Sequence, residues 1–551
     1  MQGLIGPLKE LAEFEELCKN KKKDVGMIRV CGCVNSQKSH MMYALGDGCK
    51  YKVIACSSET KAKQIYEEYR FLDSNTYLYP AKDFLFYQAD IRSKELVKQR
   101  MEGIQAVLSG EPVTVVTSLD GFMDHLAPKE SIAEKVLKIQ NDSILKLDEM
   151  AEKLSVIGYD REVQVEGPGQ FAVRGGILDI YPLTEELPVR IELWGDEVDS
   201  IRTFDVESQR SIENLMDIVI YPAVEFPQNG EKGVSFLDYF PPEDTILFLD
   251  EPVRLVERGQ NIEDEFMEAQ KKRLESGYDL EEEEAKIFPV TEILKKINCY
   301  SSIGFCALGM KCKGLEVRES YEIQAKSVNP YNNSFEMLTQ DLKRLKRNGY
   351  RVILLSGSRT RAKRLAEDLR DYNLSSYYSE DLDREVKPGE IMTAYGYIAE
   401  GYEYPMLKFT VIAESDIFGK RKKKKKRKTY EGRKIQSFSE LKPGDYVVHE
   451  NHGVGVYQGI EKIVVDKISK DYMKISYAQG GNLYIPATQL DLIQKYASAD
   501  AKKPKLNKLG TQEWNRTKTK VRGAVKEIAR DLVKLYAARQ EQDGYVYGAF
   551  L

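Results

Sequence analysis

Residues 442–460 read KPGDYVVHENHGVGVYQGI, and this stretch decides how the carboxy-terminal part of the chain is interpreted. The dipeptide Pro443-Gly444 predicts a turn, and the alternating YVVH that follows predicts a strand. Gly453 and Gly455 flank a valine where we expect a tight bend. Three further strand patterns lie at 463–465, 472–477 and 483–485. Short strands at this spacing predict a small β-barrel, and because no catalytic cluster lies inside it, we interpret it as a docking module.

Length and composition predict a multidomain protein. A chain of 551 residues exceeds the usual domain size of about 150 residues several times over. The net charge is −5, but Lys420 to Lys428 (KRKKKKKRK) is a run of nine cations, so the rest of the chain sums to −14. An acidic bulk argues against a general nucleic-acid coat. The eight cysteines lack C-x-x-C spacing, and neither a signal peptide nor an apolar run long enough for a membrane is apparent, so we expect a cytoplasmic protein with free thiols.

Changes of pattern along the chain predict an α/β multidomain architecture. Residues 1–134 and 222–325 alternate buried strands with helices and are predicted to form one open α/β sheet. A strand-rich α+β insertion, with FAVRGGILDIYP and VRIELW, interrupts them at 135–221. A small α/β domain is expected at 326–418, a basic linker at 419–437, the barrel at 438–497 and a long amphipathic helix at 511–541.

The segment GCVNSQKS is a damaged form of a phosphate-binding loop. It follows a predicted strand and keeps Gly32, Lys38 and Ser39 of the pattern G-x-x-x-x-G-K-[ST]. The second glycine is replaced by Gln37, whose side chain should hinder the backbone from wrapping phosphates. The plainer alternative is an ordinary strand-to-helix loop.

A second segment, ILFLDEP, places Asp250 and Glu251 at the end of a buried strand. Such an acidic pair holds magnesium and orients water in ATPases of this kind, although it is equally compatible with an exposed strand end. Together with the damaged loop, it predicts a decayed ATPase fold that binds no cofactor and hydrolyses no ATP.

Over essentially its whole length, the chain resembles the bacterial transcription-repair coupling factors (the Mfd family). The segments FAVRGGILDIYP, RIELWGDEVDSIRTFDVESQRS and ILFLDEP are similar to the module related to UvrB, in which a degenerate ATPase fold is interrupted by a UvrA-binding domain. The stretch KPGDYVVHENHGVGVYQG is similar to the RNA-polymerase-interacting domain shared with CarD-like (Tudor-like) regulators. The helix at 511–541 resembles the relay helix that leads to the family's translocase motor. We expect that motor, with its ATP and magnesium, to be missing from this chain.

The resemblance implies a UvrA-binding site at Arg174, Arg190 and Trp194 on the insertion. Arg190 and Trp194 lie four residues apart on a predicted strand and therefore share a face. Arginine and tryptophan are enriched at interface hot spots. In the alternative interpretation, Trp194 fills a core and the arginines pair with Glu192 or Asp196.

The resemblance also implies that Ile463, Val464 and Val465 contact the β subunit of RNA polymerase. In the family, the corresponding strand adds to a sheet of that subunit, so that backbone hydrogen bonds supply affinity. Ile463 is the candidate for the exposed apolar contact; the alternative is that it faces the barrel core.

The remaining features leave alternatives open. The basic run is either a solvated linker or a weak, salt-sensitive DNA contact, while most DNA binding is expected from the missing motor. His449 and His452 lack a third ligand, so no metal site is expected. We therefore expect a monomeric recruitment scaffold that docks on stalled RNA polymerase and presents 135–221 to UvrA for nucleotide excision repair of the transcribed strand. Its rivals are an active ATPase and a free-standing CarD-like regulator.

Overall fold

The computed structural model divides the chain into two compact units, the first comprising residues 1–87 and 95–425, the second built mainly from residues after 425. It describes residues 2–21, 24–82, 94–206, 208–227, 230–275, 287–419, 433–434, 441, 443–449, 452–465, 468–486, 493–496, 504–509, 514 and 517. None of the helices in these ranges is long and apolar enough to cross a membrane. The predicted helix at 511–541 and the basic run from Lys420 to Lys428 fall outside the described residues, apart from Trp514 and Thr517.

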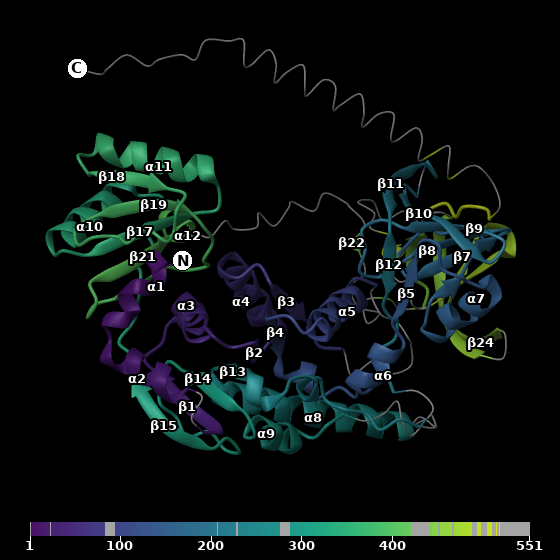
Figure 1. Ribbon diagram of the computed structural model, residues 1–551, viewed down its shortest axis with the longest axis horizontal. Helices are drawn as coiled ribbons and strands as arrows, with labels where there is room; N and C mark the ends of the chain where they lie inside the picture. The colour runs from purple at the N-terminus through teal and green to yellow at the C-terminus, as the bar shows by residue number, and fades with distance from the viewer. Residues whose placement is uncertain are drawn as a thin grey trace, which may run out of the picture. The chain divides into compact units, whose positions relative to one another are not determined.

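The first unit is organised around a seven-stranded parallel sheet, as the apolar runs predict (Figure 1). Its order is β15 (Val317–Glu322), β1 (Gly26–Cys31), β14 (Ser301–Phe305), β13 (Thr245–Asp250), β2 (Tyr51–Cys56), β4 (Val113–Ser118) and β3 (Thr76–Tyr79). Helices α3 (Asn35–Leu45) and α4 (Glu59–Leu72) cover one face, and α5 (Lys94–Leu108), α8 (Pro252–Glu275) and α9 (Val290–Ile297) cover the other. Strands covered on both faces are apolar throughout, which explains segments such as VTVVTS and TILFLD.

The insertion is a six-stranded sheet packed on one helix. The order is β11 (Ser211–Leu215), β10 (Glu197–Phe204), β9 (Val189–Trp194), β8 (Ile177–Tyr181), β7 (Gln170–Arg174) and β6 (Asp160–Arg161). The apolar side chains of one face form a core with α7 (Leu147–Val156). Strands β5 (Leu137–Gln140) and β12 (Asp217–Ile220) pair antiparallel and bring together the two ends of the insertion.

A third sheet forms the small α/β domain, in the order β16 (Lys326–Ser327), β20 (Tyr402–Tyr404), β21 (Phe409–Ala413), β17 (Arg351–Ser356), β19 (Ile391–Tyr395) and β18 (Ser376–Ser379). Its own helices α10 (Phe335–Arg347) and α11 (Arg359–Asp371) bury one face. The opposite face, including Ile353 and Val411, belongs to the same core as α3 and α4. The domain therefore covers its second face with helices of the first sheet and shares a core with them.

The second unit contains one antiparallel sheet, in the order β22 (Arg433–Lys434), β27 (Ile493–Lys495), β23 (Tyr446–His449), β24 (Gly453–Val465), β25 (Ile468–Ser476) and β26 (Asn482–Pro486). In the ranges described, β22 and β26 are the end strands and no pairing joins them, so the small barrel predicted from the sequence is seen there as a six-stranded sheet without closure.

The strand boundaries at the GVG segment also differ from the prediction. Gly453 and Gly455 do not flank a bend but begin β24, which continues without interruption through Ile463 to Val465. Gly455 is needed for close packing, because a Cβ there would lie 2.5 Å from Cγ2 of Ile475.

Candidate functional site

The segment that resembles a phosphate-binding loop leads from β1 directly into a helix. Only three residues separate β1 from α3, which begins at Asn35, so Lys38 and Ser39 lie within its first turns and not in a loop. The chain bends at Gly32, where φ is +78° and a Cβ would lie 2.4 Å from the backbone oxygen of Ile323. A phosphate-binding loop exposes several backbone N–H groups, whereas here that of Lys38 is already bonded to Val34 O at 3.2 Å.

Lys38 is held by the acidic pair, a contact that the sequence analysis did not predict. Its Nζ lies 2.7 Å from Oδ1 of Asp250 and 2.7 Å from Oε1 of Glu251, and both Lys38 and Asp250 are buried. Burial disfavours the charged amine, but attraction to Asp250 and hydrogen bonds to both carboxylates outweigh it and raise the pKa of Lys38. The charge that would meet a phosphate is thus neutralised within the protein.

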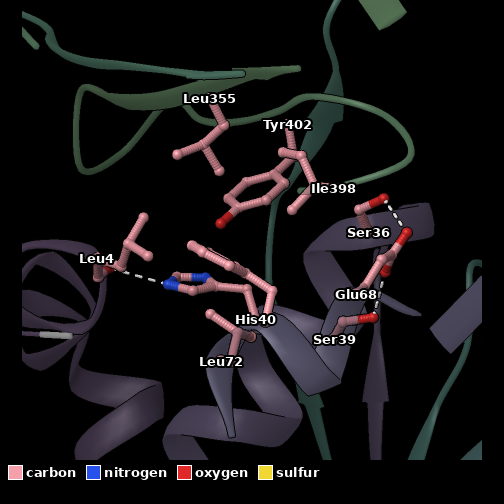
Figure 2. A pocket seen from close by; sticks show the side chains of 10 residues that line it. Leu4, Ser36, Ser39, His40, Glu68, Leu72, Leu355, Ile398 and Tyr402 are labelled. Carbon is pink, nitrogen blue, oxygen red and sulfur yellow. Dashed lines mark hydrogen bonds between the residues drawn. The ribbon is translucent and has the colours of Figure 1, made fainter. Parts of the chain in front are cut away.

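Glu68, on α4, occupies the hydroxyl donors beside the lysine (Figure 2). Ser36 Oγ donates to its Oε1 at 2.7 Å and Ser39 Oγ to its Oε2 at 2.5 Å. The backbone N–H of Ala399, from the small α/β domain, donates to the same carboxylate at 3.2 Å. An internal carboxylate therefore binds donors that a phosphate would need. Sequence analysis missed Glu68, although its place on the buried face of α4 was a signal.

Gln37 connects the first sheet to the small α/β domain. Its Oε1 accepts from the N–H of Val34 at 3.2 Å, and its Nε2 donates to Oη of Tyr404 at 3.1 Å. Tyr404 Oη lies 3.0 Å from Nδ1 of His40, whose Nε2 lies 2.9 Å from the backbone oxygen of Leu4. Because that oxygen only accepts, Nε2 carries the proton and Tyr404 donates to Nδ1.

This relay requires an uncharged histidine. Burial lowers the pKa of His40 to about 4, so its ring is neutral near pH 7. The side chains of Leu355, Ile398 and Tyr402 lie over His40 and the two serines, and together these residues line a small pocket (Figure 2). The side chains of Ser36, Gln37, Lys38 and Ser39 are thus all engaged by partners within the chain.

The second candidate site is the solvent face of the insertion. Arg174 and Arg190 both bind Asp179, which is only 1% exposed: Nη2 of Arg174 lies 2.5 Å from Oδ2, and Nε of Arg190 lies 2.7 Å from Oδ1. Arg190 also stacks over the ring of Phe204, 4.5 Å from its centroid. The expected alternative partners, Glu192 and Asp196, are wrong, because the β8–β9 register sets Asp179 directly opposite Arg190.

Trp194 ends β9 and is 85% exposed, which excludes the alternative that it fills a core. Residues 190, 192 and 194 alternate with the buried Val189 and Ile191 and the partly buried Leu193, so the tryptophan shares the arginines' face. The structure thus gathers Arg174, Arg190 and Trp194 on one face of the sheet, where Trp194 is exposed, the Arg174 side chain is 42% exposed and the Arg190 side chain is only 15% exposed. Asp179, which holds both arginines, was not recognised from the sequence.

The third candidate site is one edge of β24. Strand β25 pairs with β24 from Val456 to Val465, whereas β23 and the preceding turn reach only to Tyr457. Among the strands described, none pairs with the other edge of β24 beyond Tyr457. On that side, Ile463, Val464 and Val465 have no strand partner within the described ranges; for these three residues the structure describes the backbone alone.

The histidines near this strand contact each other, with the rings of His449 and His452 4.8 Å apart. Over the described ranges, no group of three or more His, Cys, Asp or Glu residues is arranged to hold a metal ion.

Comparison with known protein families defines two modules on this chain. Residues 137–226 match the UvrB interaction domain, and residues 441–497 match the CarD-like/TRCF RID domain. The first match contains Arg174, Arg190 and Trp194, which we call the arginine–tryptophan face. The second match contains the edge of β24 that has no partner among the described strands.

Similar proteins carry the name transcription-repair-coupling factor. The one from Bacillus subtilis (strain 168) is 30% identical over 98% of this chain and 51% of its own length. That from Staphylococcus haemolyticus (strain JCSC1435) is 28% identical over 86% of this chain and 45% of its own. The chain thus spans about half the length of the curated relatives it matches. A solved structure, a hypothetical ATP-dependent RNA helicase from Sulfolobus tokodaii, aligns with a TM-score of 0.20 at 10% sequence identity. The alignment covers 72% of this chain and 82% of that chain, and a likeness this weak supports no conclusion about fold or function.

Proposed function

We propose that this chain is the recruitment part of a transcription-repair-coupling factor. It docks on stalled RNA polymerase through residues 438–497 and presents the insertion to UvrA, so that nucleotide excision repair starts on the transcribed strand. The observation that carries the proposal is the presence of two separate exposed binding features, the arginine–tryptophan face and the open β24 edge, in segments that match a UvrB interaction domain and a CarD-like domain. An ATP-driven motor belongs to the family's remaining length and is not assigned to these residues.

The arginine–tryptophan face suits a protein partner with acidic side chains. Asp179 fixes both guanidinium groups, so little side-chain freedom is lost when they bind. Trp194 offers a large, exposed aromatic surface beside them. We assign UvrA as the partner, with Arg174 and Arg190 facing its carboxylates and Trp194 entering an apolar pocket.

Replacing Trp194 with Ala is expected to weaken UvrA binding by about 10- to 100-fold, with smaller losses for Arg174→Ala and Arg190→Ala. Isothermal titration calorimetry with UvrA encoded by the same genome measures the affinity, and circular dichroism checks that each variant is folded. Arg161→Ala, on the far edge strand β6, is the matched control and should bind as the unmodified chain does. Unchanged affinity in all three test variants would contradict the assignment of this face as the UvrA-binding site.

The β24 edge suits strand addition. Backbone N–H and C=O groups along residues 458–465 have no strand partner on that side among the described strands, and an incoming strand of the polymerase β subunit would satisfy them. Ile463 is proposed as the apolar side chain that accompanies this pairing.

Ile463→Arg is expected to abolish capture of RNA polymerase, because a charged side chain would enter an apolar contact. The readout is a pull-down of purified polymerase on the immobilised chain. Met406→Arg, at a 75% exposed methionine of the first unit, controls for a non-specific effect of the added charge. If the Ile463→Arg variant captures as much polymerase as the Met406→Arg control, the proposed contact is refuted.

A further inference from the structure

We infer that Ile144 is a further UvrA-contacting residue, which extends the arginine–tryptophan face by a second apolar anchor. This inference rests on the proposed function of the insertion, whose UvrA contact it deepens. It arises from the turn between β5 and α7, a segment that the sequence patterns did not single out.

Ile144 is exposed but firmly held. The turn adds to the free side of β10: Leu145 N donates to Asp196 O at 2.7 Å, and Val198 N donates to Ser143 O at 2.9 Å. Ile144 lies directly opposite Glu197 in this pairing. Its neighbour Leu145 is buried in the core of the insertion, whereas Ile144 is 83% exposed. The backbone pairing thus holds Ile144 in place while its large apolar side chain remains exposed to solvent.

Ile144 and Trp194 belong to one row across the sheet. Glu197 is paired with Trp194 on one side and with Ile144 on the other, and residues opposite one another in antiparallel strands point to the same face. The two side chains, 85% and 83% exposed, therefore flank Glu197 on the solvent face. Two large exposed apolar side chains on either side of one charged residue, on the same face, are a pattern that suits a protein interface.

The surrounding charges define the chemistry of the partner. Three of the five arginines within residues 137–226 lie on this face: Arg174, Arg190 and Arg202. Arg190 is bound by Asp179 and Arg202 is paired with Glu192, so Arg174 is the arginine with N–H groups to spare. Arg174 binds Asp179 through Nη2 alone and is 42% exposed, so its remaining N–H groups are available to a carboxylate. The matching surface is an apolar pocket bordered by carboxylates, and UvrA is the occupant to which we commit.

The test compares Ile144→Ala, Ile144→Asp and Ile144→Leu by calorimetry with UvrA from the same genome and the full chain. We expect about 10-fold weaker binding for the alanine variant and a larger loss for the aspartate variant, whereas leucine retains affinity because it keeps the apolar surface. Val163→Ala is the matched control, since Val163 is 87% exposed but follows β6 at the opposite edge of the sheet, and it should bind normally.

The outcomes separate this inference from the proposal on which it rests. If Ile144→Ala and Ile144→Asp bind UvrA as the unmodified chain does while Trp194→Ala weakens binding, the inference is overturned and the proposed function stands. If neither Ile144 nor Trp194 variants change the affinity, both are overturned. Equal losses in Ile144→Ala and Val163→Ala would also overturn the inference, because the effect would not be local to the row.

Discussion

Arg100→Met is expected to lower the free energy of unfolding of the first unit by about 3–5 kcal/mol, since breaking a fully buried ion pair leaves uncompensated charge. Arg100 is 0% exposed. Its Nε donates to both carboxylate oxygens of Glu225, at 2.7 and 2.8 Å, and its Nη2 donates to Asp124 at 2.8 Å. Nη1 donates to the backbone oxygen of Pro80 at 3.0 Å, and the guanidinium lies 4.4 Å from the ring centroid of Tyr79.

The position of Glu225 makes this effect relevant to function. It follows β12, where the chain leaves the insertion and returns to the first sheet. Arg100 on α5 therefore ties the insertion to the first sheet. Methionine approximates the length of the arginine stem but supplies no donors, so two buried carboxylates lose their partner.

Guanidinium-induced unfolding followed by circular dichroism measures the loss. Arg258→Met is the control, because Arg258 is 40% exposed and lies 3.9 Å from Asp120, a geometry expected to contribute less than about 1 kcal/mol. A loss for Arg100→Met as small as that of the control contradicts the assigned role of the Arg100 cluster.

The second large effect is expected for Lys38→Met, which should destabilise the first unit by about 3 kcal/mol because it leaves buried Asp250 without its cation. The raised pKa of Lys38 keeps this contribution fully present at neutral pH and below the ordinary lysine pKa; it is lost only as the pH rises through the folded value. The same unfolding measurement applies, with Lys63→Met on the exposed side of α4 as the control.

A fluorescent ATP analogue distinguishes this structural role from an active nucleotide site. We expect no saturable binding by the unmodified chain, and none by Gln37→Gly, because Glu68, Asp250 and Glu251 still hold the serines and the lysine. Saturable ATP binding that Lys38→Met removes would support the rival ATPase hypothesis.

The sequence predicted local elements more successfully than the contacts between them. Strands β9 and β13 lie where VRIELW and ILFLDEP predict strands, because runs of apolar and β-branched residues bounded by polar or turn residues carry that information locally. The role of Gln37 could not be predicted, because Tyr404 lies 367 residues away along the chain.

Other differences have similar causes. The pairing of Asp179 with Arg174 and Arg190 could not be predicted, because it depends on the register of the β7–β8 and β8–β9 hairpins. Single residues do not determine that register. The length of β24 was not predicted, because its glycines were interpreted as signs of a turn. In the structure they allow close packing at Gly455 and a bulge near Gly459. The small α/β domain was expected to be separate because its own sequence does not reveal which helices cover its second face.

The central claim is that one chain joins RNA polymerase to UvrA, and a bridging assay tests it most directly. RNA polymerase is immobilised, and retention of UvrA is measured with and without the chain. We predict that UvrA is retained only when the chain is present, that Trp194→Ala leaves the chain bound but releases UvrA, and that Ile463→Arg abolishes retention of both. Retention of UvrA that is independent of the chain, or unaffected by both substitutions, would contradict the account.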